Sequence, residues 1–544
     1  MTDLNHLAEA WLAVDPDPET RAELTAVITA GDTEGLAERF SGRLQFGTAG
    51  LRGALGAGPM RMNRVVVRRA AWGLVQHVLA TDPAAARRGV LIGCDARKNS
   101  DVFALDTARV AAALGVRSML LPPHVPTPLL AFSITELDAA AGVMVTASHN
   151  PPADNGYKVY LDTGSQIVPP SDTEISAWID RAPADVPVAE EDHVLIESLG
   201  DEPLQRYLGA IRSLRGAPGM DSVVIAYSPL HGVAGRPLLA AFDRAGLPTP
   251  AVVEVQFEPD PTFPTVRFPN PEEPGTMDLL IERAVEIGAD VAIANDPDGD
   301  RLGAAIPLRD GTWRKMTGDE LGCLLADHLL RTTSGDDRLV VTTLVSSTLL
   351  SKMAAATGVH YAETSTGFKW IARAVLDRPE LRLLMGYEQA LGYLVASQPL
   401  DKDGISAAVL LGEIAAAAVA SGRMLIDLLD DIVARYGRHV TCERSVRMEP
   451  AAGKAAVEAL RADPPAELAG RTVTAVEWFD DAGLLRLQLG DHARVQVRPS
   501  GTEPKVKVYG EAVDESPEAL VVALAARLVA SGTASAAPAG RAQS

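Results

Sequence analysis

The chain has 544 residues, 47% of them hydrophobic, and a formal net charge of −21. This length supports roughly three to four domains, and so acidic a chain is a poor partner for nucleic acid or an anionic membrane. No apolar run reaches transmembrane length, the N-terminus lacks a signal-peptide pattern, and Cys94, Cys323 and Cys442 lack metal-site spacing, so we expect a cytoplasmic protein with free thiols.

Residues 1–40 are predicted to form an N-terminal helical extension, because apolar and charged positions alternate there at helical spacing. The glycine-rich stretch 46–53 follows. Its three glycines let backbone amides approach an anion, and Arg52 adds a cation. Most glycine-rich loops are simply turns, so this signal is weak by itself.

A first α/β domain is predicted over residues 41–200. Its predicted elements are helix 63–79, strand 89–93 with a polar tip at 95–100, helix 101–114, and strands 118–121 and 141–145. Strands and helices that alternate in this way favour a parallel sheet with right-handed crossovers. The last strand ends at Thr146, and the Pro151-Pro152 pair prevents further strand or helix. Ser148 is thus presented at the carboxyl end of a strand, where open α/β sheets form their sites.

Three further domains are predicted, over residues 201–308, 309–430 and 431–530. The predicted elements are strands 223–227, 291–294, 302–307 and 339–343, helices ending near 245 and spanning 276–287, a long alanine-rich helix opened by the turn 401–404, and the short strands 472–478, 484–489 and 494–498. The last three strands indicate an α+β domain. The tail 531–544 is rich in Ala, Gly, Ser and Pro and is expected to be disordered.

Asp296, Asp298 and Asp300 are carboxylates on alternate residues of the turn after strand 291–294. Pro297 and Gly299 can fold the backbone so that all three converge, and such hard oxygen ligands suit Mg²⁺. An EF-hand is excluded, because its sixth and twelfth positions would be Arg301 and Pro307 instead of Gly and Glu. A phosphatase with an aspartate nucleophile and a solvated acidic turn remain alternatives.

Ser148 could instead be the nucleophile of a hydrolase. A nucleophile elbow has glycine two residues before and after the serine, whereas this chain has Thr146 and Asn150 there. His149 directly follows the serine and is poorly placed to act as its base. A phosphorylated serine next to Mg²⁺ needs no such base, because it needs metal, amides and cations.

Two later loops carry groups that suit a sugar phosphate. Glu388, between Gly386 and Gly392, offers a bidentate acceptor for paired hydroxyls. The stretch 498–502 combines a guanidinium, hydroxyls and a glycine amide, which suits a phosphate monoester. Taken alone, the first is more often a solvated loop residue, and the second is equally well a hairpin turn.

Together these stretches resemble the α-D-phosphohexomutase (phosphoglucomutase/phosphomannomutase) family. The motifs at 146–151, 296–301, 386–390 and 498–504 occur in the family's order. Residues 46–53 and 366–370 resemble the branch of bacterial α-phosphoglucomutases and the phosphoglucomutase-2/phosphopentomutase group. The resemblance implies an α/β fold with four domains around a central cleft: three related α/β domains with mixed sheets and a C-terminal α+β domain.

The resemblance also implies a role for each matching residue. Ser148 would carry a phosphoryl group and share a Mg²⁺ ion with the three aspartates. Lys158 would be the general base and acid, although alone it resembles an exposed lysine. The remaining implied residues are Arg52, Arg301 and His149 beside the phosphoserine, Thr366, Gly367, Glu388 and Ala390 at the sugar, and Arg498, Ser500, Gly501 and Thr502 at the distal phosphate. The family often has Ser at the position of Ala390.

The implied activity is the interconversion of hexose 1-phosphate and hexose 6-phosphate through a hexose 1,6-bisphosphate. Mg²⁺ would be the cofactor, glucose 1,6-bisphosphate the activator, and a small sugar phosphate the partner of a monomer or homodimer. A phosphopentomutase, acting on ribose 1-phosphate, and a non-catalytic sugar-phosphate-binding protein are the alternatives. Glucose and mannose differ by one epimeric hydroxyl, so the sequence does not rank them.

Overall fold

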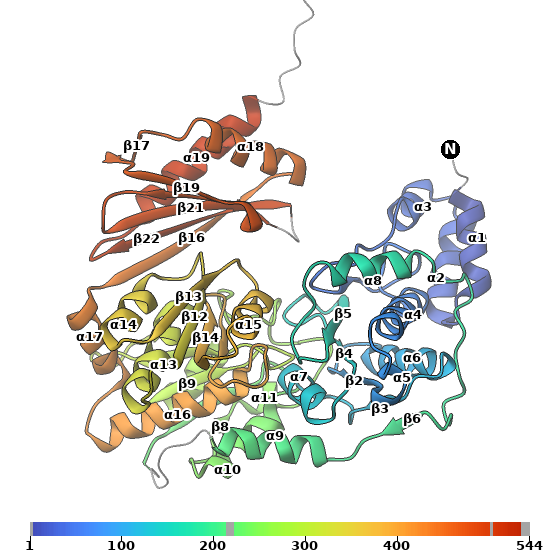
Figure 1. The fold of residues 1–544 in the computed structure, drawn as a ribbon, viewed down its shortest axis with the longest axis horizontal. Helices are drawn as coiled ribbons and strands as arrows, with labels where there is room; N and C mark the ends of the chain where they lie inside the picture. The colour runs from blue at the N-terminus through green and yellow to red at the C-terminus, as the bar shows by residue number, and fades with distance from the viewer. Residues whose placement is uncertain (1–3, 214–221, 501–503, 535–544) are drawn as a thin grey trace, which may run out of the picture.

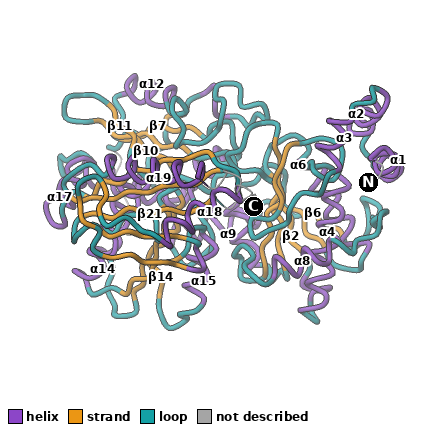
Figure 2. Tube along the Cα trace, turned by 90° about the horizontal axis from the view of Figure 1, so that it is seen from above, coloured by secondary structure: helices purple, strands orange, loops and turns teal. Residues whose placement is uncertain are grey.

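The computed structural model describes residues 4–213, 222–500 and 504–534, which contain four main sheets (Figure 1). Each of these sheets is covered by helices and marks one domain, numbered here 1 to 4 in chain order. Three α/β domains and a C-terminal α+β domain are therefore present, which confirms the predicted fold class. Domain 1 lies beside the other domains when the molecule is seen from above (Figure 2).

The N-terminal extension is helical. It consists of α1 (Leu4–Val14), α2 (Pro18–Thr29) and α3 (Thr33–Phe40). The side chain of Asp17 caps α2 by accepting from the Glu19 amide, and Pro18 takes the first helical position, where no amide hydrogen is needed. Trp11, Leu24 and Phe40 form a small core of their own, and Arg69 of α4 lies over the Trp11 ring. The extension thus packs onto domain 1.

The sheet of domain 1 has the strand order β1-β5-β4-β2-β3-β6. Its strands are β1 (Leu51–Ala54), β2 (Val90–Cys94), β3 (Ser118–Leu120), β4 (Ala141–Val145), β5 (Asp154–Leu161) and β6 (Ile196–Ser198), and its helices are α4 (Arg64–Thr81), α5 (Ala85–Arg88), α6 (Ser100–Ala113), α7 (Thr127–Glu136) and α8 (Ser171–Ile179). β2, β3 and β4 are parallel, as expected, but β5 runs antiparallel to β4. The loop after β4 is too short for a crossover helix, so the chain turns straight back.

Domains 2 and 3 also have mixed sheets, with the orders β11-β10-β9-β7-β8 and β13-β12-β14-β15. Domain 2 contains α9 (Glu202–Ser213), β7 (Ile225–Ser228), α10 (Gly235–Ala245), β8 (Ala251–Val252), α11 (Glu254–Phe257), α12 (Asp278–Ile287), β9 (Val291–Ala294), β10 (Gly303–Pro307) and β11 (Trp313–Lys315). Domain 3 contains α13 (Gly318–Thr332), β12 (Arg338–Thr343), α14 (Leu349–Thr357), β13 (His360–Thr364), α15 (Phe368–Leu376), β14 (Arg382–Glu388), β15 (Gly392–Leu394), α16 (Gly404–Ala420) and α17 (Leu425–Tyr436).

One hydrophobic core runs from domain 1 through domains 2 and 3. Phe132 of α7, Tyr227 of β7 and Tyr387 of β14 belong to the same buried cluster. No single helix in the described part of the chain is long and apolar enough to cross a membrane. Among the described helices, one bent pair, α16 and α17, passes that test of length and composition when taken together, and the two meet at an angle of 94°.

Domain 4 is an antiparallel sheet with the order β16-β22-β21-β20-β19. Its elements are β16 (His439–Arg447), α18 (Pro450–Ala462), the short pair β17 (Glu467–Leu468) and β18 (Arg471–Thr472), β19 (Ala475–Phe479), a 3-10 turn (Asp480–Ala482), β20 (Leu484–Gln488), β21 (Ala493–Pro499), β22 (Lys505–Val513) and α19 (Glu518–Ala534). Gln496 of β21 donates to the Leu344 carbonyl of domain 3 at 2.6 Å. α19 extends into the predicted tail, whose residues 535–544 lie outside the described part.

Candidate active site

Ser148 lies in the loop that follows β4, and it is 3% exposed. Its backbone has φ +50°, a left-handed conformation that costs a residue other than glycine on the order of 1–3 kcal/mol. Its amide donates to Thr146 Oγ1 at 2.8 Å, and its carbonyl accepts from Arg97 at 2.6 Å. The surrounding loop therefore holds Ser148 in a conformation that the residue would not adopt alone.

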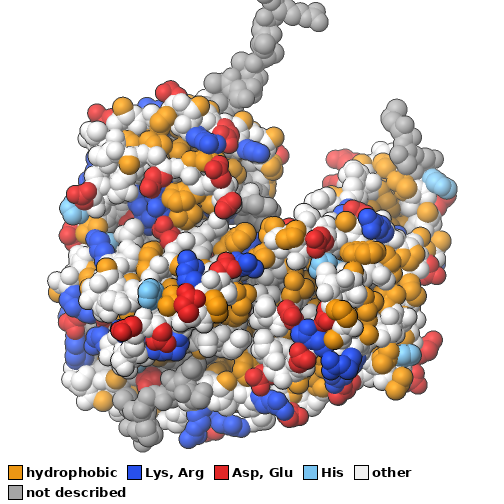
Figure 3. All heavy atoms as spheres, in the orientation of Figure 1, with side chains coloured by type: hydrophobic (Ala, Val, Ile, Leu, Met, Phe, Trp, Pro, Cys, Tyr) orange, Lys and Arg blue, Asp and Glu red, His pale blue; other side chains and the backbone are white. Residues whose placement is uncertain are grey.

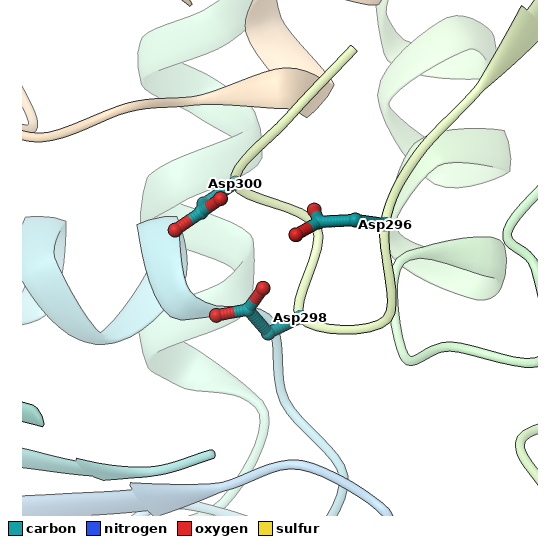
Figure 4. A group of neighbouring side chains, drawn as sticks. All are labelled: Asp296, Asp298 and Asp300. Carbon is teal, nitrogen blue, oxygen red and sulfur yellow. The ribbon is translucent and has the colours of Figure 1, made fainter. Parts of the chain in front are cut away.

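The three aspartates lie in the loop between two strands (Figure 4), β9 and β10, and all three are buried. One carboxylate oxygen from each lies within 4.8 Å of the others. Gly299, with φ +73°, provides the tight turn that aims them at the same space. Ser148 Oγ donates to Asp296 Oδ2 at 2.7 Å, so domains 1 and 2 meet at the serine hydroxyl.

Lys158 enters the same cluster from β5. Its ammonium lies 2.6 Å from Asp298 Oδ2 and 2.8 Å from Asp300 Oδ2, and its side chain is 3% exposed. The isolated sequence resembles that of an exposed lysine, but the inner positions of β5 are buried and Lys158 is one of them. Burial opposes the charged form, yet the two aspartates raise the pKa of Lys158, so the ammonium is the counter-ion of the cluster.

The donor set fits a hard divalent cation. Asp298 Oδ1 and Asp300 Oδ1 are buried without a hydrogen-bond partner among the described residues, which is costly unless a cation takes them. Burial and the two neighbouring carboxylates raise the pKa of Asp296 well above its usual value. Burial also opposes ionisation of Asp298, but Lys158 holds its pKa below the usual range. Mg²⁺ would find three converging carboxylates and the serine oxygen here.

Two arginines and a histidine lie around the serine. Arg52 is on β1, Arg301 follows the aspartate loop, and the Nε atoms of both are buried without a hydrogen-bond partner in the described part of the chain. The Arg301 amide also donates to Asp296 Oδ1 at 3.0 Å. His149 Nδ1 lies 3.1 Å from Ser148 Oγ, and burial with the nearby Arg301 and Arg52 lowers its pKa well below the usual value. The site thus combines guanidinium groups with a neutral imidazole.

The expected sugar residues lie in domain 3. Glu388 is the last residue of β14 and not a loop residue, and Ala390 is in the turn to β15. Burial raises the pKa of Glu388, which the charge of Lys402 opposes. Thr366 and Gly367 precede Phe368, whose ring centroid lies 5.6 Å from Lys402 Nζ.

Lys402 was missed by the sequence analysis. It lies in the turn before α16, and its ammonium is 3.3 Å from Asp300 Oδ2. The stretch 401–404 appeared only as a helix start, although a lysine between two aspartates just before a buried helix is a usable signal. Lys402 links the aspartate cluster to Glu388 and Phe368.

The expected phosphate clamp lies apart from this cluster. Arg498 is near the end of β21, and its contacts in the described part of the chain, with the Pro499 carbonyl and Tyr509, are within domain 4. Ser500 follows β21, whereas Gly501 and Thr502 lie outside the described residues. The surface is deeply hollowed between domain 4 and domain 1 (Figure 3).

Four domain families account for most of the chain. They are described as phosphoglucomutase/phosphomannomutase α/β/α domains I, II and III and the C-terminal domain, and they match residues 43–185, 205–308, 317–436 and 444–528. The chain belongs to the phosphoglucomutase/phosphomannomutase family. This result confirms the predicted resemblance, and the chain is accordingly a phosphosugar mutase, an isomerase that transfers a phosphoryl group.

Individual relatives agree with this assignment. The mutase is 42% identical over 475 residues to a probable phosphomannomutase of Haemophilus influenzae, which covers 84% of this chain and 94% of the relative. It is 35% identical over 552 residues to a probable phosphoribomutase of Schizosaccharomyces pombe, with 93% of both chains covered. A crystal structure of a putative phosphomannomutase from Thermus thermophilus superimposes with a TM-score of 0.70 at 26% identity, covering 90% of this chain and 99% of that one.

Proposed function

We propose that the mutase interconverts hexose 1-phosphate and hexose 6-phosphate through a phosphorylated Ser148 and a hexose 1,6-bisphosphate. The observation that carries this proposal is the 2.7 Å contact between Ser148 Oγ and Asp296 in a buried cluster of three carboxylates. His149 Nδ1 lies 3.1 Å from Ser148 Oγ, closer than its place next to the serine predicted, and a neutral imidazole there could serve a hydrolase as base; the phosphoserine is favoured because the serine hydroxyl donates to Asp296 within the carboxylate cluster, which a serine hydrolase does not need. A phosphoserine needs cations and a metal site, which surround Ser148 here.

Each half-reaction moves one phosphoryl group. A sugar hydroxyl attacks the phosphorus of phospho-Ser148, the serine O–P bond breaks, and the hydroxyl proton must leave. Lys158, whose ammonium reaches the cluster from β5, is the candidate proton relay: it gives one proton to the departing Ser148 Oγ, and the amine so formed takes the proton of the sugar hydroxyl. Mg²⁺, when bound by the three aspartates and the serine oxygen, would supply charge neutralisation at the transferring group. Arg52 and Arg301 would hold the phosphoryl oxygens through their free Nε donors.

The bisphosphate then turns end for end and returns its other phosphate to Ser148. The sugar would be oriented by Glu388, Lys402, Thr366, Gly367 and the backbone near Ala390. The distal phosphate would be held by Arg498 together with Ser500, Gly501 and Thr502. Free glucose 1,6-bisphosphate would act as an activator by charging Ser148. Cytoplasmic location and a monomeric or homodimeric state stay predictions.

A phosphopentomutase is the second candidate, favoured by the S. pombe relative named as a probable phosphoribomutase. Rates on glucose 1-phosphate, mannose 1-phosphate and ribose 1-phosphate, each with the matching bisphosphate, separate the two. A non-catalytic binding protein would show no turnover on any of them.

The phosphoserine is tested separately by intact mass. Wild type should be partly heavier by one phosphate, whereas Ser148→Ala should carry none and should have no mutase activity. Normal turnover by Ser148→Ala would end the proposal. The variant should remain folded, because Ser148 is at a loop tip and not within a helix or strand.

A further inference from the structure

Arg97 lies in the polar segment between β2 and α6 and has no part in the proposed phosphoryl transfer. Its side chain is only 1% exposed. Its guanidinium donates to four backbone carbonyls of the loop that carries Ser148. Nη2 bonds to Ser148 and Asn150, each at 2.6 Å, and Nη1 bonds to Pro151 at 2.8 Å and Asp154 at 3.1 Å. One planar group therefore spans the loop from the serine to the start of β5.

Arg97 is itself fixed from two sides. Its Nε lies 3.4 Å from Asp95 Oδ2, and Asp95 Oδ1 accepts from the Arg97 amide at 3.0 Å and from Ser100 Oγ at 2.7 Å. The other side belongs to domain 2, because the ring centroid of Phe263 lies 4.9 Å from the guanidinium carbon. The arginine is therefore charge-compensated and packed between two domains.

The hydrogen bonds within the loop are all short in range. The Ser148 amide donates to the Thr146 hydroxyl, the Asn150 amide to the Ala147 carbonyl, and the Asn150 side chain to Asp154. Pro151 and Pro152 have no amide hydrogen to donate, and Ser148 has a left-handed backbone that is unfavourable for a serine. Arg97 adds donors from outside the loop and ties its beginning and its end to one group.

We propose that Arg97 is a positioning residue for phosphoryl transfer: by binding the carbonyls of loop 146–154 it keeps Ser148 Oγ aimed at Asp296. Arg97 contacts the backbone of the loop and acts on the reacting oxygen only through it. The inference rests on the proposed phosphoserine function.

Lysine cannot reproduce this arrangement. An ammonium keeps the charge but lacks the planar fork that reaches paired carbonyls on one side and stacks on an aromatic ring on the other. Arg97→Lys should therefore increase the positional freedom of Ser148 Oγ, while the contacts to the sugar and to the distal phosphate stay intact. A displacement of about 1 Å at a reacting atom costs up to roughly 100-fold in rate, so we expect kcat to fall about 10- to 100-fold with KM changed less than about threefold.

The matched control is Arg64→Lys. Arg64 is in the same domain, on α4, and its guanidinium donates to both oxygens of the fully buried Asp106, at 2.6 and 2.9 Å. This change removes a comparable bidentate guanidinium contact in domain 1 and leaves loop 146–154 unchanged. It should leave kcat and KM near the wild-type values.

The experiment uses the full chain with Mg²⁺ and saturating glucose 1,6-bisphosphate. Steady-state kinetics on glucose 1-phosphate give kcat and KM, and hydrogen exchange of peptides covering residues 146–154 reports on the loop. Support requires a lower kcat, a steady KM and faster exchange of the loop in Arg97→Lys alone. Wild-type kcat in Arg97→Lys, or an equal loss of kcat in Arg64→Lys, would overturn the proposal.

Asp95→Asn is the milder second variant, in case Arg97→Lys does not fold. It keeps the size of the side chain that orients Arg97 and removes its charge, so it should lower kcat several-fold at unchanged KM, and a wild-type kcat would count against the role of Arg97. Failure of the proposed function is distinguishable, because it would appear in the wild type as missing phosphate on Ser148 and missing turnover.

Discussion

Replacing Lys158 with methionine tests whether the Lys158 ammonium stabilises the fold as the counter-ion of the buried aspartates. The Lys158 ammonium is within 2.8 Å of two carboxylates that are themselves 0–1% exposed. Methionine keeps most of the volume and removes the charge. Removing one partner of a buried ion pair typically costs about 3–5 kcal/mol, because the remaining charge stays buried and unpaired. We expect this loss in the free energy of unfolding when EDTA is present.

Mg²⁺ should restore part of the loss. A ligand at 100 times its Kd stabilises the folded state by about 2.7 kcal/mol. In Lys158→Met the ion would also compensate charges that the lysine no longer covers, so the variant should gain more from Mg²⁺ than the wild type does. Mutase activity should remain absent, because the proton carrier is gone. Urea unfolding followed by tryptophan fluorescence, with EDTA and with Mg²⁺, measures both effects.

The control is Lys98→Met, which removes an exposed pair with Glu19 and should cost at most about 1 kcal/mol. If Lys158→Met unfolds at the wild-type urea concentration in EDTA, Lys158 is not the counter-ion of the aspartates. Equal gains from Mg²⁺ in variant and wild type would show that the ion and the lysine do not share these carboxylates.

Three further changes test other parts of the site. Asp298→Asn should abolish Mg²⁺-dependent turnover, because a hard anionic ligand becomes neutral; full activity in the variant after chelation would contradict the metal assignment. Arg498→Ala should lower kcat/KM by about one to two decades for glucose 1-phosphate and glucose 6-phosphate alike, since a charge-assisted contact is worth roughly 1.5–3 kcal/mol; unchanged binding of both monophosphates would exclude Arg498 as the clamp. Asp319, buried at the junction of domains 3 and 4, has its pKa raised by burial to about 6. Its contribution to stability is therefore present below about pH 4 and lost as the pH rises through about 6, so the wild type should lose about 3 kcal/mol relative to Asp319→Asn between pH 4 and pH 7, as measured by urea unfolding.

The strands that carry the two central loops could be predicted from the sequence. β4 and β9 are short, fully buried apolar runs, and each stops at small or polar residues that allow a sharp turn. Local patterns of this kind fix where a strand ends and which side chains follow it. The expected convergence of Asp296, Asp298 and Asp300 is likewise a local property of the turn, and the structure has it.

Features that depend on distant partners could not be predicted in this way. β16 was missed because it has charged residues on its exposed positions and little apolar alternation. The burial of Lys158 depends on β5 turning back antiparallel beside β4, which no pattern within β5 specifies. The contact of Lys402 with Asp300 joins residues about one hundred positions apart, so the local pattern 401–403 could mark the lysine but could not name its partner.

The contacts around the centre explain how one serine could serve both ends of a sugar. Thr127 of domain 1 bonds to Asp298 through its amide at 2.8 Å and its hydroxyl at 2.6 Å. The Gly404 amide of domain 3 donates to the Gly299 carbonyl at 3.2 Å, and a Cβ on Gly404 would lie 2.2 Å from the Arg301 carbonyl. Domains 1, 2 and 3 therefore hold the reacting groups against one another, whereas Arg498 belongs to a domain across the hollow. A bisphosphate that reverses its orientation needs this division between a fixed centre and a separate domain. Its transferring end must meet the fixed centre, while its other end needs only a clamp that accepts either phosphate.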